Sequence, residues 1–359
     1  MVVRNEADAL PRFLEAVRGC WDELCVIDTG SDDGTIALLK RAGAKIQELP
    51  WNDDFASARN ASLHLATSDW VLILDPDEFP ADGFAQELRR ALSRDEVGAY
   101  LLPFRNLLDG GHHRDCSLLR LFRRDATIHF EHAIHEDAGR SVRAMLSASG
   151  LTSSSLTTQV VHEGYLRARA TSKGKQERDR RILSSAIDRD PDDLYLRFKL
   201  LEQARFWGDN DLLEQTALAT VAALADPKQA LANDLPRVPW GGELLTLLAE
   251  GVGRTPDDQL DLLTNWSPAV QTGPALLLRR AELLEQVGRL DEAADVFRSC
   301  LDAQDDGTIQ RTTSRPLLGL VRIALLQGNT EEARVFCRRA LDCAPDDPEA
   351  RYAAQMLLQ

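Results

Sequence analysis

An apolar run that ends in closely spaced acids carries the clearest chemistry in this sequence. Residues 70–74 read WVLIL, and residues 75–78 read DPDE. The apolar run predicts a strand buried on both faces, and the acids then stand in the crevice beyond its carboxyl end. Asp75 and Asp77 suit a hard divalent cation in that position, and such a cation can hold a diphosphate.

Two other interpretations of these acids are open. The first is an acidic turn on the surface, which conflicts with the burial that the apolar strand needs. The second rests on likeness, because D-x-D after an apolar strand also resembles the nucleophile motif of haloacid dehalogenases. Those enzymes carry Thr or Val where this chain has Phe79.

A second polar segment follows another apolar run. Residues 28–35 read DTGSDDGT after the run that ends in Val26-Ile27. In an α/β sheet the end of such a strand faces the ligand crevice, so we expect Asp28 to point into it. Alternatively, Asp28 and Ser31 cap the next helix. The letters DTGS also resemble the aspartic-protease signature, but the chain has no second copy of it.

Between these two segments, residues 51–60 read WNDDFASARN and lead from an acidic loop into a predicted helix. Arg59 would offer a planar fork to phosphate oxygens near the start of that helix. The competing interpretation is a local ion pair with Asp53 or Asp54. Six of the seven histidines lie between His112 and His162, which places any histidine chemistry in the first half of the chain.

Composition limits the classes of protein. The 359 residues carry 42 Lys and Arg against 57 Asp and Glu, a net charge of −15, which argues against a nucleic-acid partner. No apolar run approaches the roughly 20 residues of a transmembrane segment. The first residues show no secretory signal, and the six cysteines form no CxxC pair, so we expect a cytoplasmic protein with reduced thiols.

The chain changes character near residue 165. Before it, short apolar runs alternate with helical patterns, which predicts an α/β sheet; the expected strands are Leu24–Ile27, Val71–Leu74, Tyr100–Phe104 and Val160–Val161. We expect a catalytic domain at 1–165, a linker helix at 166–190 and an all-α domain at 191–359.

The helical half contains a repeat. Gly288, Ala293 and Phe297 are followed 40 residues later by Gly328 and Ala333, with Phe336 one position short and Cys337 in register. Ala333, Ala340 and Pro345 have the spacing of tetratricopeptide repeats, and 305–314 would be a long loop between units. A weaker copy includes Ala204 and Gly208. An irregular helical bundle is the alternative.

Taken in order, the motifs resemble family-2 glycosyltransferases of GT-A fold, and specifically the bacterial subgroup with tetratricopeptide repeats. The matching segments are N-E-x-x-x-L at 5–10, DTGSDDGT at 28–35, WNDDFASARN at 51–60, SDWVLILDPDE at 68–78, RLFRR at 120–124, IHE at 134–136 and VHEGY at 161–165. The resemblance covers roughly the first half of the chain.

The resemblance implies a role for individual residues. Asp28, with Ser31 beside it, would contact the base or ribose of a nucleotide-sugar, with a UDP-sugar favoured, and Arg59 its base or diphosphate. Asp77 would bind Mn²⁺ or Mg²⁺ directly, Asp75 would bind the ribose or a metal-bound water, and His162 would be the third metal-side ligand.

The resemblance also implies a single inverting displacement at the anomeric carbon. Glu136 or Asp137 would take the proton of the acceptor, with Asp115 in reserve. The remaining histidines are expected in the acceptor groove or in structural roles: His112, His113, His129 and His132. The acceptor stays open among a peptide or protein, a glycan and a lipid-linked sugar, with the repeats favouring a protein.

Two departures from the family pattern stand out. Only Met1, Val2 and Val3 precede Arg4-Asn5-Glu6, so we expect the true start to lie upstream. Pro76 stands between the two acids where Ala is common, and it fixes φ there.

Two other classes of function compete with the enzyme. In one, a tetratricopeptide scaffold carries a degenerate glycosyltransferase domain. In the other, a nucleotidyltransferase, a glycine-rich basic loop is needed at the first strand, and residues 2–10 contain no glycine.

Overall fold

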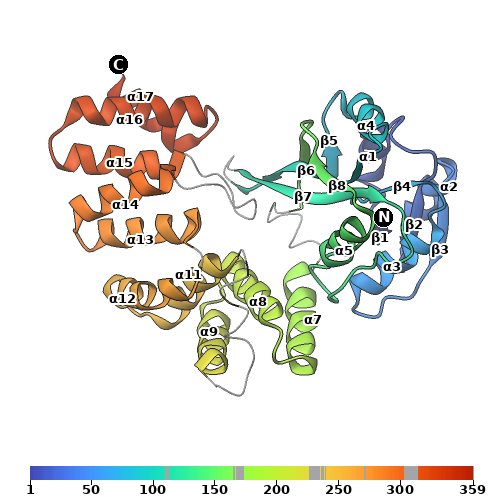
Figure 1. The fold of residues 1–359 in the computed structure, drawn as a ribbon, viewed down its shortest axis with the longest axis horizontal. Coiled ribbons are helices and arrows are strands. Elements are labelled where there is room, and N and C mark those ends of the chain that lie inside the picture. The colour runs from blue at the N-terminus through green and yellow to red at the C-terminus, as the bar shows by residue number, and fades with distance from the viewer. Residues whose placement is uncertain are drawn as a thin grey trace. The chain divides into compact units, whose positions relative to one another are not determined.

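Figure 1 shows the computed structural model of the protein. The structure describes residues 1–109, 113–164, 166, 174–225, 235, 238, 240–270, 272–302 and 314–358. The chain forms two compact units, which divide between Ile182 and Leu183. The first unit therefore includes the beginning of the helix that the sequence predicts at residues 166–190.

The first unit opens with a three-stranded parallel sheet, in the order β1-β2-β3. Its strands are β1 (Val2–Val3), β2 (Cys25–Asp28) and β3 (Lys45–Glu48), and helices α1 (Leu10–Ala16), α2 (Thr35–Arg41) and α3 (Phe55–Leu65) connect and follow them. Val26 and Ile27 are fully buried, as a parallel strand covered by helices requires. This strand–helix alternation confirms the predicted α/β class.

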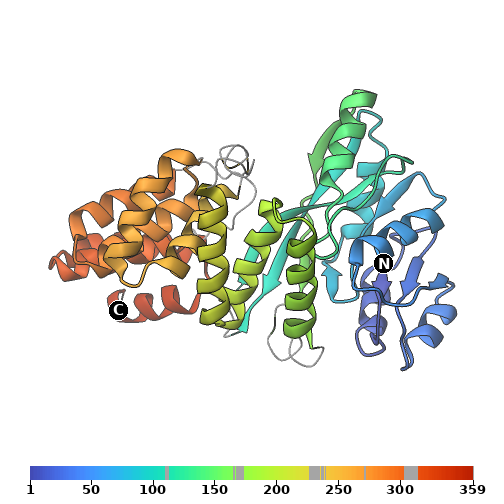
Figure 2. The same ribbon diagram turned by 90° about the horizontal axis from the view of Figure 1, so that it is seen from below.

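A second, mixed sheet has the order β4-β7-β6-β9-β5, with β8 also pairing with β6. Its strands are β4 (Trp70–Leu72), β5 (Glu78–Pro80), β6 (Val97–Leu107), β7 (His113–Arg123), β8 (Thr152–Ser155) and β9 (Val160–His162); α4 (Phe84–Leu92) and α5 (Gly139–Ser149) belong to this part of the chain. The antiparallel pair β6–β7 is its longest element, visible in teal in Figure 2.

The predicted strands correspond to β2, β4, β6 and β9, with shifted ends. Strand β6 covers Val97–Leu107, which is six residues more than the apolar run at 100–104. The sequence analysis missed β3, β5, β7 and β8. Strand β8 reads TSSS and β3 reads KIQE, so neither has an apolar run, and β5 is only three residues long. Tertiary pairing, rather than side-chain pattern, makes these segments extended.

The second unit is helical throughout its described residues. Figure 1 labels α7 (Lys175–Arg189), which begins in the first unit, and then α8 (Leu194–Trp207), α9 (Asn210–Ala225), α11 (Gly241–Val252), α12 (Pro256–Trp266), α13 (Pro274–Gln286), α14 (Leu290–Asp302), α15 (Ser314–Leu326), α16 (Thr330–Cys343) and α17 (Pro348–Leu357). A short 3-10 turn, Ser267–Ala269, follows α12.

The same kind of turn joins the two helices in each of three helix pairs. Gly208, Gly288 and Gly328 have φ of 71°, 79° and 77°, a left-handed conformation that glycine adopts without strain. The next residue in each turn donates its N–H to a carbonyl five positions back, at 2.8–2.9 Å. The same turn chemistry therefore joins α8 to α9, α13 to α14 and α15 to α16, and it includes the weaker copy expected at Gly208.

The repeated alanines lie where helices cross. Ala293 and Ala333 are fully buried, and so are Phe297 and Cys337, which occupy equivalent places in the two pairs. Cys337, not Phe336, is thus the structural counterpart of Phe297. The loop predicted at 305–314 lies outside the described residues except for Ser314, which starts α15. Among the described residues, no helix combines the length and apolar character that crossing a bilayer requires.

Replacement of Gly319 by alanine tests the packing of these repeats. A Cβ at this position in α15 would lie 2.4 Å from the ring of the fully buried Phe297. We expect Gly319→Ala to destabilise the helical unit by about 1–3 kcal/mol through overpacking. Thermal denaturation followed by circular dichroism measures the effect. The matched control is Ser299→Ala, an exposed position on α14 that should leave the transition unchanged; equal transitions for both variants would contradict the packing.

Candidate functional site

The acids after β4 meet the histidine segment through strand pairing. Strands β5 and β9 are antiparallel, with Glu78 opposite His162. Glu163 donates its backbone N–H to the carbonyl of Asp77 at 3.1 Å. The segment at 75–78 therefore lies beside the segment at 162–164 although more than 80 residues separate them.

The Asp75–Glu78 turn accommodates the unusual proline. Glu78 N–H donates to the Asp75 carbonyl at 3.0 Å, which closes a four-residue turn with Pro76 in its second position. Proline is favoured in this position because its fixed φ matches the turn and its missing N–H is not needed. Pro76 thus supports the turn that presents Asp77.

His162 is held in one tautomer beside Asp77. Its Nδ1 lies 2.7 Å from Asn106 Oδ1, an acceptor, because the other end of that amide donates to Cys116 Sγ at 3.3 Å. Nδ1 therefore carries the proton and Nε2 carries the lone pair, at 3.8 Å from Asp77 Oδ1. Burial lowers the pKa of His162, against the opposing charge of Asp77, so the ring is neutral near pH 7.

Gly164 makes room for this pair. A Cβ on Gly164 would lie 2.4 Å from His162 Nε2 and 2.8 Å from Asp77 Oδ2. No side chain fits there without moving one of the two groups. The glycine in H-x-G is thus required by close approach of the backbone to both side chains.

Arg59 connects the acids to a second loop. Its side chain is only 4% exposed; Nη2 donates to both oxygens of Asp75, at 2.6 and 2.7 Å, and Nε donates to Glu136 Oε1 at 3.0 Å. Burial alone would raise the pKa of Asp75, but Arg59 and Arg120 outweigh it and hold that pKa below its usual range. Asp75 is therefore an ionised partner of Arg59.

The alternative pairing of Arg59 within its own segment is wrong. Asp53 forms its ion pair with Arg181, at 2.6 Å, and Asp54 caps α3 by accepting the N–H of Ser57 at 2.9 Å. The surface-turn interpretation of the acids is wrong as well, because Asp75 binds the buried guanidinium of Arg59.

Glu78 and Arg120 stabilise the Asp75–Glu78 turn, and neither was predicted as a site residue from the sequence. Glu78 is 1% exposed; it accepts the N–H of Asp75 and a hydrogen bond from Arg120 Nη2, each at 2.9 Å. Burial raises the pKa of Glu78 to about 8, although Arg120 opposes the shift. The sequence signal was present, since Glu78 follows D-P-D directly and RLFRR begins with Arg120.

Asp28 lies at the end of β2 and is 1% exposed. Its Oδ2 accepts the N–H groups of Gly30 and Ser31 at 3.0 and 2.9 Å, whereas Ser31 Oγ accepts the N–H of Asn5. Helix α2 starts from Gly34 with no side-chain cap. The helix-capping interpretation of Asp28 and Ser31 is therefore wrong.

Two buried polar atoms at this end of the sheet have no hydrogen-bond partner among the described residues. They are Asp28 Oδ1 and Arg59 Nη1, an acceptor and a donor. Helix α3, which carries Arg59, packs against β2, which ends at Asp28. Leaving such groups unsatisfied costs about 1–3 kcal/mol each, so they point to a polar ligand.

The three candidate bases lie in different settings. Glu136 shares the guanidinium of Arg59 with Asp75. Asp137 accepts the N–H of Gly139 at 3.0 Å and so supports the start of α5. Asp115 lies on β7, where both oxygens bind Arg105 at 2.9 and 2.8 Å. Of the three, Glu136 alone is joined to Asp75 by a common cation.

The loop that carries Glu136 is constrained by hydrogen bonds. Asn60 donates to the Phe130 carbonyl at 3.0 Å and accepts the Phe130 N–H at 2.7 Å, which imitates a strand pairing. Backbone bonds also join Glu131 and Asp137. These contacts hold His132 and His135 at φ of 67° and 53°, a left-handed conformation unusual for histidine.

His129 and His113 lie near acids other than Asp77. His129 Nε2 is 3.3 Å from Glu131 Oε1, and His113 is 4.0 Å from Asp115. His112 and Tyr165 lie outside the described residues.

The residues present fit a divalent cation with two protein ligands. In the described part of the chain, no group of three or more His, Cys, Asp or Glu side chains is arranged to hold a metal. Asp77 and His162 lie together, whereas Arg59 binds both oxygens of Asp75. Mg²⁺ and Mn²⁺ suit such a pair, since they keep several water ligands and take phosphate oxygens from a substrate.

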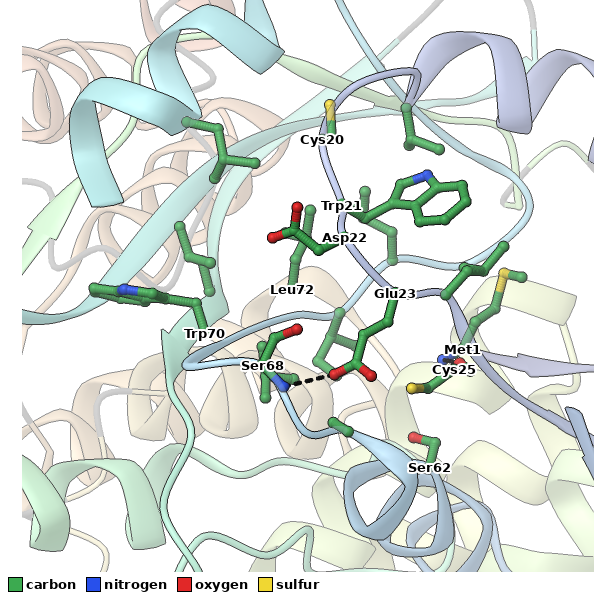
Figure 3. Close-up of a pocket in the computed structure, with 18 of the residues that line it drawn as sticks. Met1, Cys20, Trp21, Asp22, Glu23, Cys25, Ser62, Ser68, Trp70 and Leu72 are labelled. Carbon is green, nitrogen blue, oxygen red and sulfur yellow. Dashed lines mark hydrogen bonds between the residues drawn. The ribbon is translucent and has the colours of Figure 1, made fainter. Parts of the chain in front are cut away.

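A cavity of about 250 Å³ is lined by Cys25 at the start of β2, by β4 and by residues on either side of β4. Figure 3 shows Trp21, Glu23, Cys25, Ser68 and Trp70 on its walls, with Ser68 N–H donating to Glu23. Its lining includes the starts of β2 and β4 and none of the predicted site residues. It is therefore distinct from the site formed by Asp28, Asp75 and Asp77.

Replacement of Asn60 by alanine tests the constraint on the loop. The change removes both hydrogen bonds to the buried backbone of Phe130, so we expect a loss of about 1–3 kcal/mol in stability and faster proteolysis within 129–137. Urea denaturation and limited proteolysis measure the two effects. Asn52→Ala, at an exposed position on the preceding loop, is the control; matching behaviour of the two variants would refute the assigned role.

Residues 1–135 match the profile of glycosyl transferase family 2, and residues 284–357 match the tetratricopeptide repeat. A TPR repeat-containing protein of Synechococcus elongatus is 39% identical over 56% of this chain and 50% of its own length. The SPbeta prophage-derived glycosyltransferase SunS of Bacillus subtilis is 23% identical over 54% of this chain and 45% of its own length.

The chain thus spans about half the length of these two relatives. Among solved structures, the glucosyl-3-phosphoglycerate synthase of Mycobacterium tuberculosis superposes with a TM-score of 0.36 at 15% identity, over 45% of this chain and 70% of its own. The profile matches fall on the two units separately. Residues 1–135 are similar to glycosyl transferase family 2, and residues 284–357 to the tetratricopeptide repeat.

Proposed function

We propose that the chain is a metal-dependent, inverting glycosyltransferase that moves a sugar from a nucleotide-sugar to an acceptor. The observation that carries the proposal is that two buried polar atoms lack partners in the described structure: Asp28 Oδ1, at the end of β2, and Nη1 of Arg59, the residue that binds Asp75. An acceptor and a donor without partners suit the hydrogen-bonding edge of a nucleobase or a ribose. The family-2 match makes a nucleotide-sugar the expected ligand, with a UDP-sugar favoured.

Asp77 and His162 are the proposed ligands for Mn²⁺ or Mg²⁺. When bound, such an ion neutralises the diphosphate of the donor and that of the departing nucleotide. Asn106 supports this role, because it fixes the His162 tautomer and leaves the lone pair on Nε2. Asp75, which is held by Arg59, is then left for the ribose or a metal-bound water rather than for direct ligation.

Glu136 is the proposed base. In a single displacement, the acceptor hydroxyl loses its proton to a Glu136 oxygen while its own oxygen bonds to the anomeric carbon. The bond from that carbon to the diphosphate oxygen breaks in the same step, so the configuration inverts. Arg59 holds Glu136 and Asp75 at fixed positions, and the loop contacts of Asn60 limit their movement.

The tetratricopeptide repeats are proposed to hold a peptide or protein that is either acceptor or partner. Such repeats build extended surfaces for other chains, which favours a protein over a glycan or a lipid-linked sugar. A cytoplasmic location stays a prediction from the sequence.

Nucleotide binding tests the donor site. We expect UDP with Mn²⁺ to raise the melting temperature of the protein, and Asp77→Asn to abolish that rise because one of two metal ligands is lost. GDP and CDP, assayed in parallel, identify the base. Asp82→Asn, an exposed acid five residues further on, should respond like the wild type. If none of the nucleotides changes the wild-type melting temperature, a scaffold with a degenerate domain becomes the better account.

Turnover tests the base. Glu136→Gln keeps an acceptor for Arg59 Nε but cannot take a proton, so we expect donor hydrolysis to fall about 100-fold or more with UDP affinity nearly unchanged. Hydrolysis of a panel of nucleotide-sugars, with water as acceptor, measures this without knowledge of the natural acceptor. Asp137→Asn and Asp115→Asn are the comparisons; normal turnover of Glu136→Gln would transfer the role to one of those acids.

A further inference from the structure

The beginning of α7 packs against the site within the first unit. Arg178 lies over the ring of Phe55, with its guanidinium carbon 5.0 Å from the ring centroid. Arg181 forms its ion pair with Asp53 at 2.6 Å. Both partners belong to the WNDDF segment that leads into α3, so the first turns of α7 are fixed beside the helix that carries Arg59.

Lys175, in the first turn of α7, approaches the metal-side residues. Its Nζ donates to the Gly164 carbonyl at 3.4 Å. Gly164 is the residue whose Cα lies against His162 Nε2 and Asp77 Oδ2. The hydrogen bond to Gly164 therefore places Lys175 one residue contact away from the proposed metal ligands.

The other cations around the site are already bound to carboxylates. Arg59 binds Asp75 and Glu136, Arg120 binds Glu78, and Arg178 binds Asp179 at 2.7 Å. The ammonium of Lys175 differs from these. In the part of the chain that the structure describes, its recorded hydrogen bond is the long one to Gly164, and no ion pair to a carboxylate is recorded for it.

Resting on the proposed function, we propose that Lys175 binds the diphosphate of the donor and stabilises the nucleoside diphosphate as it departs. A half-buried ammonium with unused donors is a strong partner for phosphate oxygens. When the bond from the anomeric carbon to the diphosphate oxygen breaks, both electrons stay on that oxygen, and its negative charge grows. A positive charge held next to Gly164 meets that change, so Lys175 acts on the leaving group rather than on the base or the acceptor.

Asp179 lies one turn after Lys175 on α7 and has a different role. Burial raises the pKa of Asp179, against the opposing charge of Arg178, and the charge of Glu136 adds to the rise. Asp179 is bound to Arg178 through two nitrogens, at 2.8 and 2.7 Å. That pair keeps Arg178 against Phe55 and so fixes the helix that carries Lys175.

Affinity for UDP compared with affinity for uridine tests the inference. Binding is measured calorimetrically in the presence of Mn²⁺ for the wild-type chain and for Lys175→Met, Lys175→Arg and Arg189→Met. We expect Lys175→Met to weaken UDP at least 10-fold and to leave uridine unchanged. Lys175→Arg should restore most of the UDP affinity. Arg189→Met removes one positive charge from an exposed position at the far end of the same helix and should stay within about twofold of the wild type for both ligands.

The possible results distinguish a failure of the role of Lys175 from a failure of the proposed function. Wild-type affinity for UDP in Lys175→Met would overturn the role of the lysine and leave the proposed function intact. An equal loss for UDP and uridine would also overturn it, since that pattern indicates a displaced base site. A similar loss in Arg189→Met would reduce the effect to net charge on α7 and overturn it too. If the wild type binds no UDP, both the inference and the proposed function fail.

Discussion

The buried guanidinium of Arg59 is the constraint on which the rest of the site depends. A cation removed from water is tolerated only when charged partners surround it, and breaking such an arrangement is costly. Asp75 and Glu136 supply the two negative charges, one from the turn after β4 and one from the loop before α5. Because both acids bind one planar group, their separation is fixed by the guanidinium itself. The donor-side acid and the proposed base are thereby held together without direct contact between their loops.

The second constraint is backbone packing at Gly164. Pairing of β5 with β9 sets His162 opposite Glu78 and brings Asp77 near His162. The backbone of residue 164 can lie close to both side chains because it is a glycine. Asn106 then selects the tautomer of His162, and Glu78 receives the N–H of Asp75. The second sheet thus sets the positions of the proposed metal ligands, whereas α3 and the loop that it binds set the position of the proposed base. Asp75 joins these two parts, because it binds both Arg59 and Glu78.

The sequence allowed the architecture and most site residues to be predicted because their signals are local. Apolar runs followed by acids located β2, β4 and the positions of Asp28, Asp75 and Asp77. The partners of Arg59 were not predictable in this way, since Glu136 lies 77 residues away in sequence. Strand β5 is three residues long, and its pairing with β9 left no periodic pattern to detect. Lys175 carried no signal, because a lysine in the first turn of a helix is ordinary until its neighbours are known.

The charges around the site bear on how a protein with a net charge of −15 could bind an anionic ligand. The proposed diphosphate would lie near Asp28, Asp75, Asp77 and Glu136, and the charge of Arg59 is already balanced by two of these acids. The charge of Arg120 also acts on the protein's own acids, because it holds down the pKa of Asp75. An anionic donor can be held there only if further positive charge arrives beside Asp77, and an acidic chain can meet that need with a divalent cation and one uncommitted lysine. The proposed metal ion and the proposed role of Lys175 both answer this imbalance of charge, because the ion would add positive charge beside Asp77 and the ammonium adds it beside Gly164.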